Sequence, residues 1–391
     1  MSAGPTASSP HNDSHTDNTS KSGFDALSTL GKNNEDEQVC FTYEKADGTT
    51  VEQLVRYPEV TYTTNFLLRE DLPGIFHSSY AVDNFYFTDR IDEFAVIDPG
   101  KKALFVDVGL YDFCGIEFLD ESLARTNTPW EDVVVFLTHS HDDHDGNAFY
   151  CLDKGAQGIL MGDLPPFSPA VTETYMNVTG MARLCTEDVG FYVTRLLGRA
   201  ELFDDYRDRI TVVHQGDRIE VGDYHFEVLE TPGHTMEHLC LLEREKGILF
   251  AGDHILDTAP GLMCYYPDVH LLKRFLDSIA HLKTLDLKYV FMCHRDALVG
   301  TDEINAFLDK ILKNYERPIN KMAGLLESGH PLTIYELAQK YYSYLPSWTE
   351  QPAILLSRRV AVAFSYLEYL YDVGRAKRTS AEDGALEYWC D

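Results

Sequence analysis

The sequence lacks the segments that mark exported and membrane-spanning proteins. No apolar run approaches the roughly 20 residues of a membrane span, and the N-terminus has no basic region followed by an apolar core. We therefore expect neither a membrane anchor nor a secretory signal. The eight cysteines are scattered, with no C-x-x-C pair and no dense framework. Reduced thiols in a cytoplasmic protein are the simplest interpretation.

Basic residues are also scarce. The chain has 33 Lys and Arg against 63 Asp and Glu, which gives a formal net charge of -30. A surface this acidic repels polyphosphates, so non-specific binding to DNA or RNA is disfavoured. The sequence also has no cluster of Lys and Arg interleaved with aromatic residues, the pattern of many nucleic-acid-binding surfaces. We expect no nucleic-acid partner.

The distribution of apolar residues divides the chain into parts. Residues 1–36 are rich in Ser, Thr, Asn, Asp and Gly with hardly any aromatics, so we expect a disordered tail. The remaining length predicts a large domain at 37–301 and a smaller one at 302–391. A β-hairpin with its turn at Ala46-Asp47-Gly48 is expected at the start of the large domain.

Short strand candidates alternate with helical stretches through most of the large domain. The continuous apolar run from Val133 ends in polar residues at His139, as expected for a strand buried on both faces. This order of elements predicts an α/β protein with layered αββα architecture. A stretch at about 165–207 is mostly helical in composition. It is either an insertion that covers one side of a site or a packing elaboration.

The periodicity becomes purely helical after about Asp302. We expect helices at about 303–328, 333–342 and 353–373, followed by a polar hairpin that turns near Asp383-Gly384. Thr333 and Glu336 have the spacing of a capping box. Three helices and a hairpin resemble a winged-helix-like module. Its apolar faces pack against the large domain or a twin subunit, or else form an exposed site for a partner.

Potential metal ligands gather in one short segment after the buried strand. The segment has the form H-x-H-x-D-H, with His139, His141, Asp143 and His144 on a loop at the end of the strand. Imidazole and carboxylate are the ligands that zinc prefers when thiolates are absent. Further candidates end other predicted strands, namely Asp107, His234, Asp253 with His254, and His294.

These five motifs, in the order in which they occur along the chain, resemble the metallo-β-lactamase superfamily in its glyoxalase II-like branch, over about residues 79–295. The resemblance implies a four-layer αββα sandwich with a dinuclear metal site. It implies that His139, His141 and His234 hold one metal and that Asp143, His144 and His294 hold the second. It further implies that Asp253 bridges the two metals, and that Asp107 orients the loop without binding metal.

The same resemblance implies a hydrolase with two zinc ions per chain and a metal-bound hydroxide as nucleophile, which Asp143 orients. Iron or manganese are alternatives, but the flavodiiron proteins of this superfamily carry a glutamate at the position of His141. His254 is a candidate catalytic residue that donates to the substrate, or it braces the loop of Asp253. The expected substrate is a small ester, thioester or lactone, and is expected to be anionic.

Several residues beside the motifs bear on the substrate. Met236-Glu237 and Met292-Cys293 stand where the branch usually has small residues, so the resemblance does not determine the shape of the pocket or the substrate. Arg358 and Arg359 are the candidates for binding a substrate carboxylate. Tyr265 and Tyr266 line the pocket or are packing residues, and His238 is expected to be structural.

Two other functional classes are open at this point. One is a metal-dependent nuclease, endoribonuclease-like, which the acidic charge and the absence of an evident β-CASP insertion disfavour. The other is a non-catalytic, metal-stabilised interaction protein, which the complete ligand set disfavours. A homodimer is possible in either case.

Overall fold

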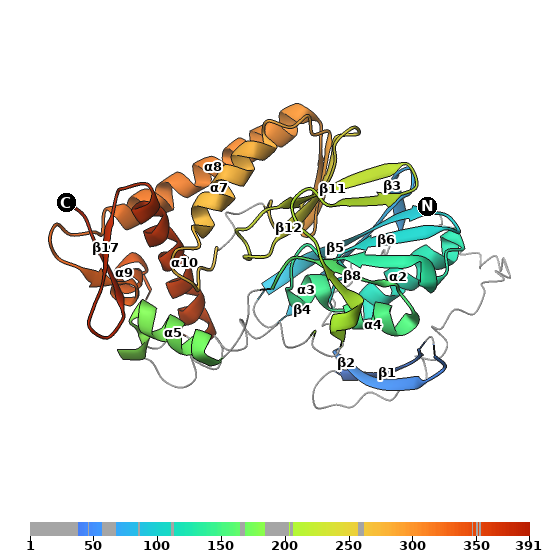
Figure 1. The fold of residues 1–391 in the computed structure, drawn as a ribbon, viewed down its shortest axis with the longest axis horizontal. Coiled ribbons are helices and arrows are strands. Elements are labelled where there is room, and N and C mark those ends of the chain that lie inside the picture. The colour runs from blue at the N-terminus through green and yellow to red at the C-terminus, as the bar shows by residue number, and fades with distance from the viewer. Residues whose placement is uncertain are drawn as a thin grey trace, which may run out of the picture.

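The computed structural model describes residues 38–45, 47–56, 68–84, 87–110, 113–164, 169–183, 203, 206–256, 262–345, 347–348, 351 and 353–391 (Figure 1). The tail expected at 1–36 and much of the insertion expected at about 165–207 lie outside these ranges. Within them, no helix combines the length and the apolar character that crossing a membrane requires.

The first sheet has seven strands in the order β3-β4-β5-β6-β7-β8-β9. Neighbours are antiparallel from β3 to β6 and parallel from β6 to β9. Parallel neighbours need crossovers, and α2 (Phe113–Thr126) and α4 (Ala148–Lys154) supply two of them. The strands are β3 (Arg69–Leu72), β4 (Ile75–Asn84), β5 (Phe87–Asp98), β6 (Lys102–Val106), β7 (Val133–Phe136), β8 (Gly158–Met161) and β9 (Ile210–Val212).

The second sheet has six strands in the order β10-β11-β12-β13-β14-β15. Its one parallel pair, β13 with β14, is joined by a connection that contains α7 (Leu271–Leu282). The strands are β10 (Arg218–Val221), β11 (Tyr224–Glu230), β12 (Leu239–Glu243), β13 (Ile248–Phe250), β14 (Tyr289–Met292) and β15 (Arg295–Val299). Tight hairpins join β10 to β11 at Gly222-Asp223 and β12 to β13 near Lys246-Gly247.

The two sheets pack face to face through apolar side chains. The apolar cluster between the sheets contains Phe94 of β5, Phe250 of β13 and Phe291 of β14, whose ring centroids lie 5.1 to 5.6 Å apart. Burial of each such ring contributes about 2 kcal/mol. Separate apolar clusters lie between the first sheet and α2 and α4, and between the second sheet and α7. The expected αββα sandwich is confirmed.

The C-terminal region is helical and ends in a small sheet. Its helices are α8 (Thr301–Ala323), α9 (Ile334–Tyr341) and α10 (Ala353–Asp372), and its strands are β16 (Leu332–Thr333), β17 (Lys377–Ser380) and β18 (Leu386–Trp389). The sheet order is β16-β18-β17. The capping box is present, because the Thr333 side chain accepts from the Glu336 N–H and the Glu336 carboxylate accepts from the Thr333 N–H.

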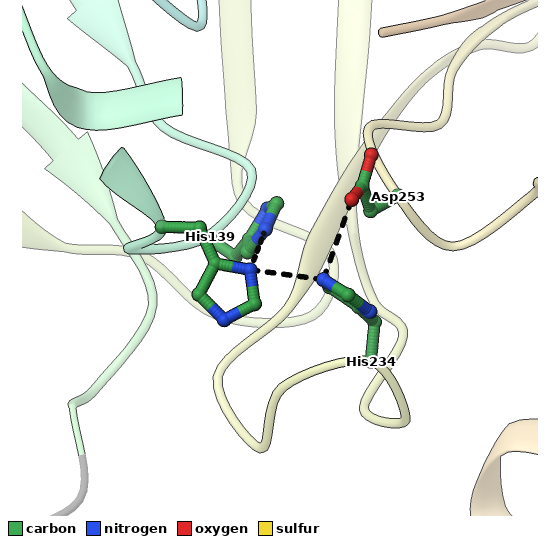
Figure 2. A group of neighbouring side chains, drawn as sticks. His139, His234 and Asp253 are labelled. Carbon is green, nitrogen blue, oxygen red and sulfur yellow. Dashed lines mark hydrogen bonds and ion pairs between the residues drawn. The ribbon is translucent and has the colours of Figure 1, made fainter. Parts of the chain in front are cut away.

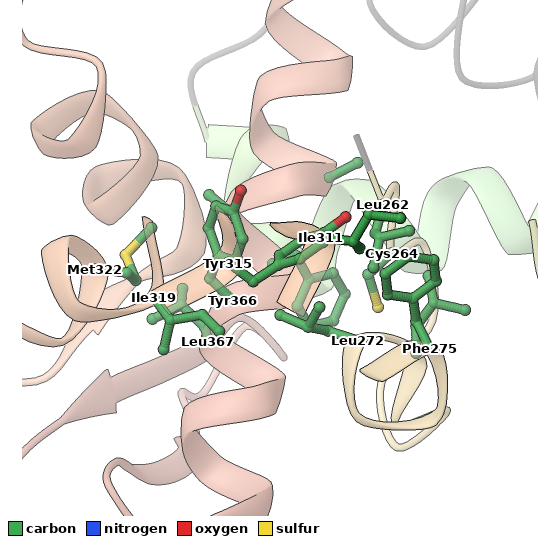
Figure 3. Close-up of a cluster of buried hydrophobic side chains, with 14 of the residues drawn as sticks. Leu262, Cys264, Leu272, Phe275, Ile311, Tyr315, Ile319, Met322, Tyr366 and Leu367 are labelled. Atoms are coloured by element: carbon green, nitrogen blue, oxygen red, sulfur yellow. The ribbon is translucent and has the colours of Figure 1, made fainter. Parts of the chain in front are cut away.

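The C-terminal helices share one apolar cluster with α7. Figure 3 shows Leu272 and Phe275 of α7 beside Ile311 and Tyr315 of α8 and Leu367 of α10. The helices therefore bury their apolar faces within the chain. The division between domains at residue 301 stays a prediction, since this cluster runs across it.

Two further elements lie at the edges of the sandwich. The predicted N-terminal hairpin forms from β1 (Gln38–Glu44) and β2 (Thr50–Arg56), and Lys45 pairs with Asp153 of α4 at 2.7 Å. The helix α5 (Pro169–Thr179) belongs to the expected insertion and contacts the C-terminal region, where the Tyr175 hydroxyl donates to the Ser357 carbonyl at 3.4 Å. Its Tyr175 lies 5.2 Å from the ring of Tyr265.

A buried carboxylate joins the small C-terminal sheet to α10. Glu368 of α10 is 2% exposed and accepts from Arg378 of β17 at 2.7 and 2.9 Å. It also accepts from the Tyr388 hydroxyl at 2.6 Å and from the Asp268 backbone N–H at 2.8 Å. Arg378 pairs in addition with the Asp268 side chain at 2.7 Å. The network fixes the segment that leads into α7.

Replacing Arg378 with Ala is expected to destabilise the fold by about 3 kcal/mol, because it leaves the buried Glu368 carboxylate without its cation. Equilibrium unfolding in urea measures the change. Lys377→Ala is the control, since Lys377 is exposed and its loss is expected to cost less than about 0.5 kcal/mol. Equal stability of the two variants would contradict this account of the network.

Candidate metal centre

The predicted ligands meet at one edge of the sandwich because they follow the ends of neighbouring strands. Asp107 follows β6, and His139 to His144 follow β7 in the first sheet. His234, Asp253 and His294 follow β11, β13 and β14 in the second. Strands β6 and β7 are parallel, as are β13 and β14, so their carboxyl ends lie at the same edge of each sheet. The sandwich therefore holds seven donor side chains on loops fixed by rigid strands.

Three histidines form the first group of donors. The Nδ1 atom of His141 lies 2.9 Å from Nε2 of His139 and 2.9 Å from Nε2 of His234. Together with Asp253, these residues offer ligand atoms that all lie within 4.8 Å of one another. Figure 2 shows His139, His234 and Asp253 pointing toward a common point.

Asp143, His144 and His294 form the second group. The Nε2 atom of His294 lies 3.5 Å from Oδ2 of Asp143, and Nε2 of His144 lies 3.9 Å from Oδ1 of Asp143. All three residues come from loops at the same edge, and α3 (Asp142–Asp145) carries two of them.

Asp253 lies between the two groups and turns one oxygen toward each. Its Oδ2 lies 3.3 Å from Nε2 of His234 in the first group. Its Oδ1 lies 3.4 Å from Nε2 of His144 and 3.1 Å from Nε2 of His294 in the second. This is the arrangement that a carboxylate bridging two ions requires.

Asp107 orients these loops through hydrogen bonds. Its Oδ1 accepts from the Thr138 N–H at 2.7 Å, and its Oδ2 accepts from the Thr138 hydroxyl at 2.8 Å and from His144 Nδ1 at 2.9 Å. The Cys293 thiol donates to the same Oδ2 at 3.3 Å. Asp107 adopts a φ of 58°, a left-handed conformation that is uncommon for a residue other than glycine. The hydrogen bonds that its carboxylate forms hold it in this conformation.

Hydrogen bonds at the Nδ1 atoms of three rings turn the Nε2 atoms toward the other predicted ligands. His144 Nδ1 donates to Asp107, and His294 Nδ1 donates to the Arg90 carbonyl at 2.6 Å. His139 Nδ1 lies 3.1 Å from the Thr138 hydroxyl, which itself donates to Asp107 and so accepts from the ring. With the proton on Nδ1, the Nε2 lone pairs of all three rings converge.

The charges at the site suit a cation. Burial lowers the pKa of His139 well below its ordinary value and lowers the pKa of His234 to about 3, so both rings are neutral, as ligation requires. Burial opposes charge on His144 as well, but Asp253 and Asp107 raise the pKa of that ring well above its ordinary value, so a metal bound there would have to displace a proton from Nε2. Burial also works against ionisation of Asp253, yet His294 and His144 hold the pKa of its carboxyl well below the usual range. The carboxylate keeps a negative charge that a cation balances.

The residues present fit a pair of divalent metal ions. The Oδ1 atom of Asp253 and the Nε2 atom of His144 are buried and have no hydrogen-bond partner among the residues that the structure describes. Buried polar atoms of this kind are costly unless they bind something. The donors are imidazole nitrogens and carboxylate oxygens, which bind divalent metals.

Two other histidines brace the loop of Asp253. His254 is fully buried, and its Nε2 lies 2.8 Å from the Ser278 hydroxyl of α7. The structure thus turns that nitrogen toward α7, which supports the bracing role, and the catalytic role of His254 stays a prediction. His238 Nε2 accepts from the Asp253 backbone N–H at 3.2 Å, while its Nδ1 lies 2.9 Å from the Thr231 hydroxyl.

Sequence reasoning missed several partners of the ligands. The Arg90 carbonyl is a backbone group that no side-chain pattern identifies. Thr138 stands beside His139 but has no distinctive signal of its own. Glu237 contacts Ser140 in the metal-binding loop, but in the sequence it stands out only as a departure from the usual small residue.

Comparison with known proteins finds a family, a fold and several relatives to which the chain is similar. The family described as Metallo-beta-lactamase superfamily matches residues 94–294 of the chain. A solved structure of a beta-lactamase domain protein from Burkholderia ambifaria superposes with a TM-score of 0.65 at 17% identity, covering 83% of this chain and 94% of that one. At this identity the likeness concerns the fold alone.

Three curated relatives are similar over parts of the chain. A lactamase-like protein from Aspergillus niger is 22% identical, covering 66% of this chain and 69% of its own length. An acyl-coenzyme A thioesterase from Bos taurus is 28% identical over 47% of this chain and 64% of its own length. A hydroxyacylglutathione hydrolase from Hahella chejuensis is 34% identical, but over only 23% of this chain and 35% of its own length. The likeness to glyoxalase II-type proteins is therefore partial.

Replacing Asp253 with Ala is expected to reduce the metal content from about two ions per chain to about one or fewer, because both sites lose a ligand. Plasma emission spectroscopy on the purified variant measures the content. Asp142→Ala is the control, since Asp142 is exposed in the same loop and belongs to neither group of donors. A variant at Asp253 that kept two ions would show the bridging assignment to be wrong.

Proposed function

The chain belongs to the metallo-beta-lactamase superfamily, and from that premise we propose that it hydrolyses a small anionic ester, thioester or lactone with two zinc ions. That it is a metal-dependent hydrolase of this fold follows from the family and from the His and Asp cluster. The metal and the class of substrate are the steps that the proposal adds.

The choice of zinc is supported by the donor set. Five imidazoles and two carboxylates, without a thiolate, suit zinc in a hydrolytic site. Iron and manganese are the alternatives, and both accept the same donors. His141 supplies a nitrogen where the redox di-iron members of the superfamily have a glutamate, which favours zinc.

Two ions held by these donor groups would supply an activated water at neutral pH and would polarise the substrate carbonyl. The residues of the chain then orient these partners. Of the two carboxylate ligands, Asp143 is the more exposed, with 28% of its side chain accessible, whereas Asp253 is 7% exposed. Asp143 is therefore placed to accept a hydrogen bond from the attacking water and to orient it. The buried Asp253 is placed to hold the two ligand groups together.

The class of substrate is supported by the names of two relatives. The Bos taurus protein is named an acyl-coenzyme A thioesterase, and the Hahella chejuensis protein is named a hydroxyacylglutathione hydrolase. Both names describe the hydrolysis of an acyl compound. We place the substrate of this chain in the same broad class.

An anionic substrate is supported by Arg358 of α10. Its Nε is buried, and the residue forms no hydrogen bond or ion pair with any residue that the structure describes. The neighbouring Arg359 is engaged, since it donates to Gln351 at 2.6 Å and lies over the ring of Tyr342. An arginine without an acidic partner among the described residues is available to bind an anion, in a chain whose acidic residues outnumber its basic ones.

Arg358 lies beside the segment that follows the loop of Asp253. The backbone N–H of Cys264 in this segment donates to the Ala361 carbonyl of α10 at 3.1 Å. Burial raises the pKa of the adjacent Tyr265, and the positive charge of Arg358 opposes that rise. Burial and the charge of Glu237 raise the pKa of the next residue, Tyr266, and the Glu237 carboxylate contacts the metal-binding loop. An anionic group bound by Arg358 would belong to a part of the substrate distant from the reacting carbonyl.

The proposal is tested with zinc-loaded protein and five substrates: a thioester, a lactone, an aryl ester, a phosphodiester and a short RNA. Hydrolysis of one or more of the first three, lost after removal of metal by a chelator and restored by zinc, is the expected result. Cleavage of only the phosphodiester or the RNA would overturn the substrate class and favour a nuclease. Restoration by iron or manganese alone would overturn the choice of zinc.

Replacing Arg358 with Ala is expected to raise KM for an anionic thioester about 10- to 100-fold, because a hydrogen bond to a charged group is worth about 1.5–3 kcal/mol. KM for a neutral aryl ester and kcat for both substrates are expected to change little. Steady-state kinetics measure all four constants. Arg375→Ala, at an exposed position, is the matched control. An equal rise in KM for the neutral ester would contradict the role in anion binding.

A further inference from the structure

Ser140 and Glu237 connect two loops that carry ligands of the first donor group. Ser140 stands between His139 and His141, and Glu237 follows His234 by three residues. The Glu237 Oε1 atom accepts from the Ser140 hydroxyl at 3.0 Å and from the Ser140 backbone N–H at 3.4 Å. Both residues are nearly buried, with 5% and 9% of their surface exposed. Little water can therefore replace either hydrogen bond.

The local sequence leaves room for Glu237 in this position. Gly162 follows β8 and faces the backbone of Glu237. A Cβ atom on Gly162 would lie 2.1 Å from the carbonyl oxygen of Glu237 and 3.1 Å from its Cβ, so no other residue fits there without displacing the loop. The absence of a side chain at Gly162 thus leaves space for the loop of Glu237, which is far away in the sequence, beside the metal-binding loop.

Glu237 is not itself one of the converging donors. It belongs to none of the groups of ligand atoms that lie within 4.8 Å of one another in the described part of the chain. Its contact with the site passes through Ser140. Any effect of Glu237 on metal binding is therefore exerted on the position of the neighbouring histidines.

We propose that Glu237 is a positioning residue that holds the loop of His139 and His141 against the loop of His234, so that the three rings converge before a metal binds. Without this contact, binding a metal would have to order the Ser140 loop, and the cost of ordering would weaken the affinity. Partners of this kind, one step removed from the ligands, typically change metal affinity 10- to 100-fold. The inference concerns metal binding and holds whichever substrate the protein hydrolyses.

The test compares zinc affinity in four variants of the full-length protein. Zinc is titrated into metal-free protein in competition with a chromophoric chelator. Glu237→Ala is expected to weaken at least one of the two zinc affinities about 10- to 100-fold. Glu237→Gln is expected to stay within about threefold of the parent protein, because its amide oxygen still accepts from Ser140. Ser140→Ala removes the hydroxyl and keeps the backbone N–H, so an intermediate loss of about 3- to 10-fold is expected.

A matched control and a second measurement separate positioning from general destabilisation. Glu245→Ala removes an exposed carboxylate from the β12–β13 turn and is expected to leave zinc affinity unchanged. Hydrogen exchange of the amides at 138–141 in metal-free protein is expected to be faster in Glu237→Ala, while exchange in β7 stays unchanged. Neither measurement depends on catalytic activity.

Two results would overturn the proposal. One is a folded Glu237→Ala variant with the zinc affinity and the loop exchange of the parent protein. The other is a Glu237→Gln variant as impaired as Glu237→Ala, because the negative charge and not the hydrogen bond would then be responsible. If Glu237→Ala does not fold, Ser140→Ala decides the matter, and unchanged zinc affinity in that variant contradicts the proposal.

Discussion

The structure depends on one constraint: seven histidine and aspartate side chains are held within a small, largely buried volume. In such a place unpaired lone pairs and like charges are costly unless a cation binds them. The surrounding hydrogen bonds are arranged to present lone pairs to a cation. Asp107 accepts from His144, Thr138 fixes His139, and the Arg90 carbonyl accepts from His294. Asp253 turns one oxygen toward each group of donors, so the two groups form one site.

The fold supplies the precision that this site needs. Each ligand follows the end of a strand whose apolar residues are packed between the sheets or beneath a helix, and the strands do not move independently. Side-chain contacts then connect loops that the sheets alone leave separate. The Asp253 loop is held by His238 on one side and by the contact of His254 with Ser278 on the other. The contact of Ser140 with Glu237 connects the loops that carry His139 and His234 in the same way.

The sequence predicts those parts of the molecule that depend on neighbours in the chain. The αββα order follows from alternating strand and helix patterns, and the capping box at Thr333 and the hairpin at Asp383-Gly384 are local signals. The donor residues could be selected because four of them fall within six positions of one loop. Partners distant in sequence escape such an analysis, as with Ser140 and Glu237, which are 97 positions apart. The strand β16 has only two residues and depends on its pairing with β18. The helix α8 ends at Ala323, short of the expected 328, because a local turn follows it.

The central claim is that two metal ions bind side by side and share Asp253. Anomalous diffraction from crystals of the zinc-loaded protein, recorded on both sides of the zinc absorption edge, tests it most directly. The account predicts two anomalous peaks about 3.5–4 Å apart, one among His139, His141 and His234 and the other among Asp143, His144 and His294, with Asp253 between them. A single peak at full occupancy, or peaks that do not contact Asp253, would contradict it.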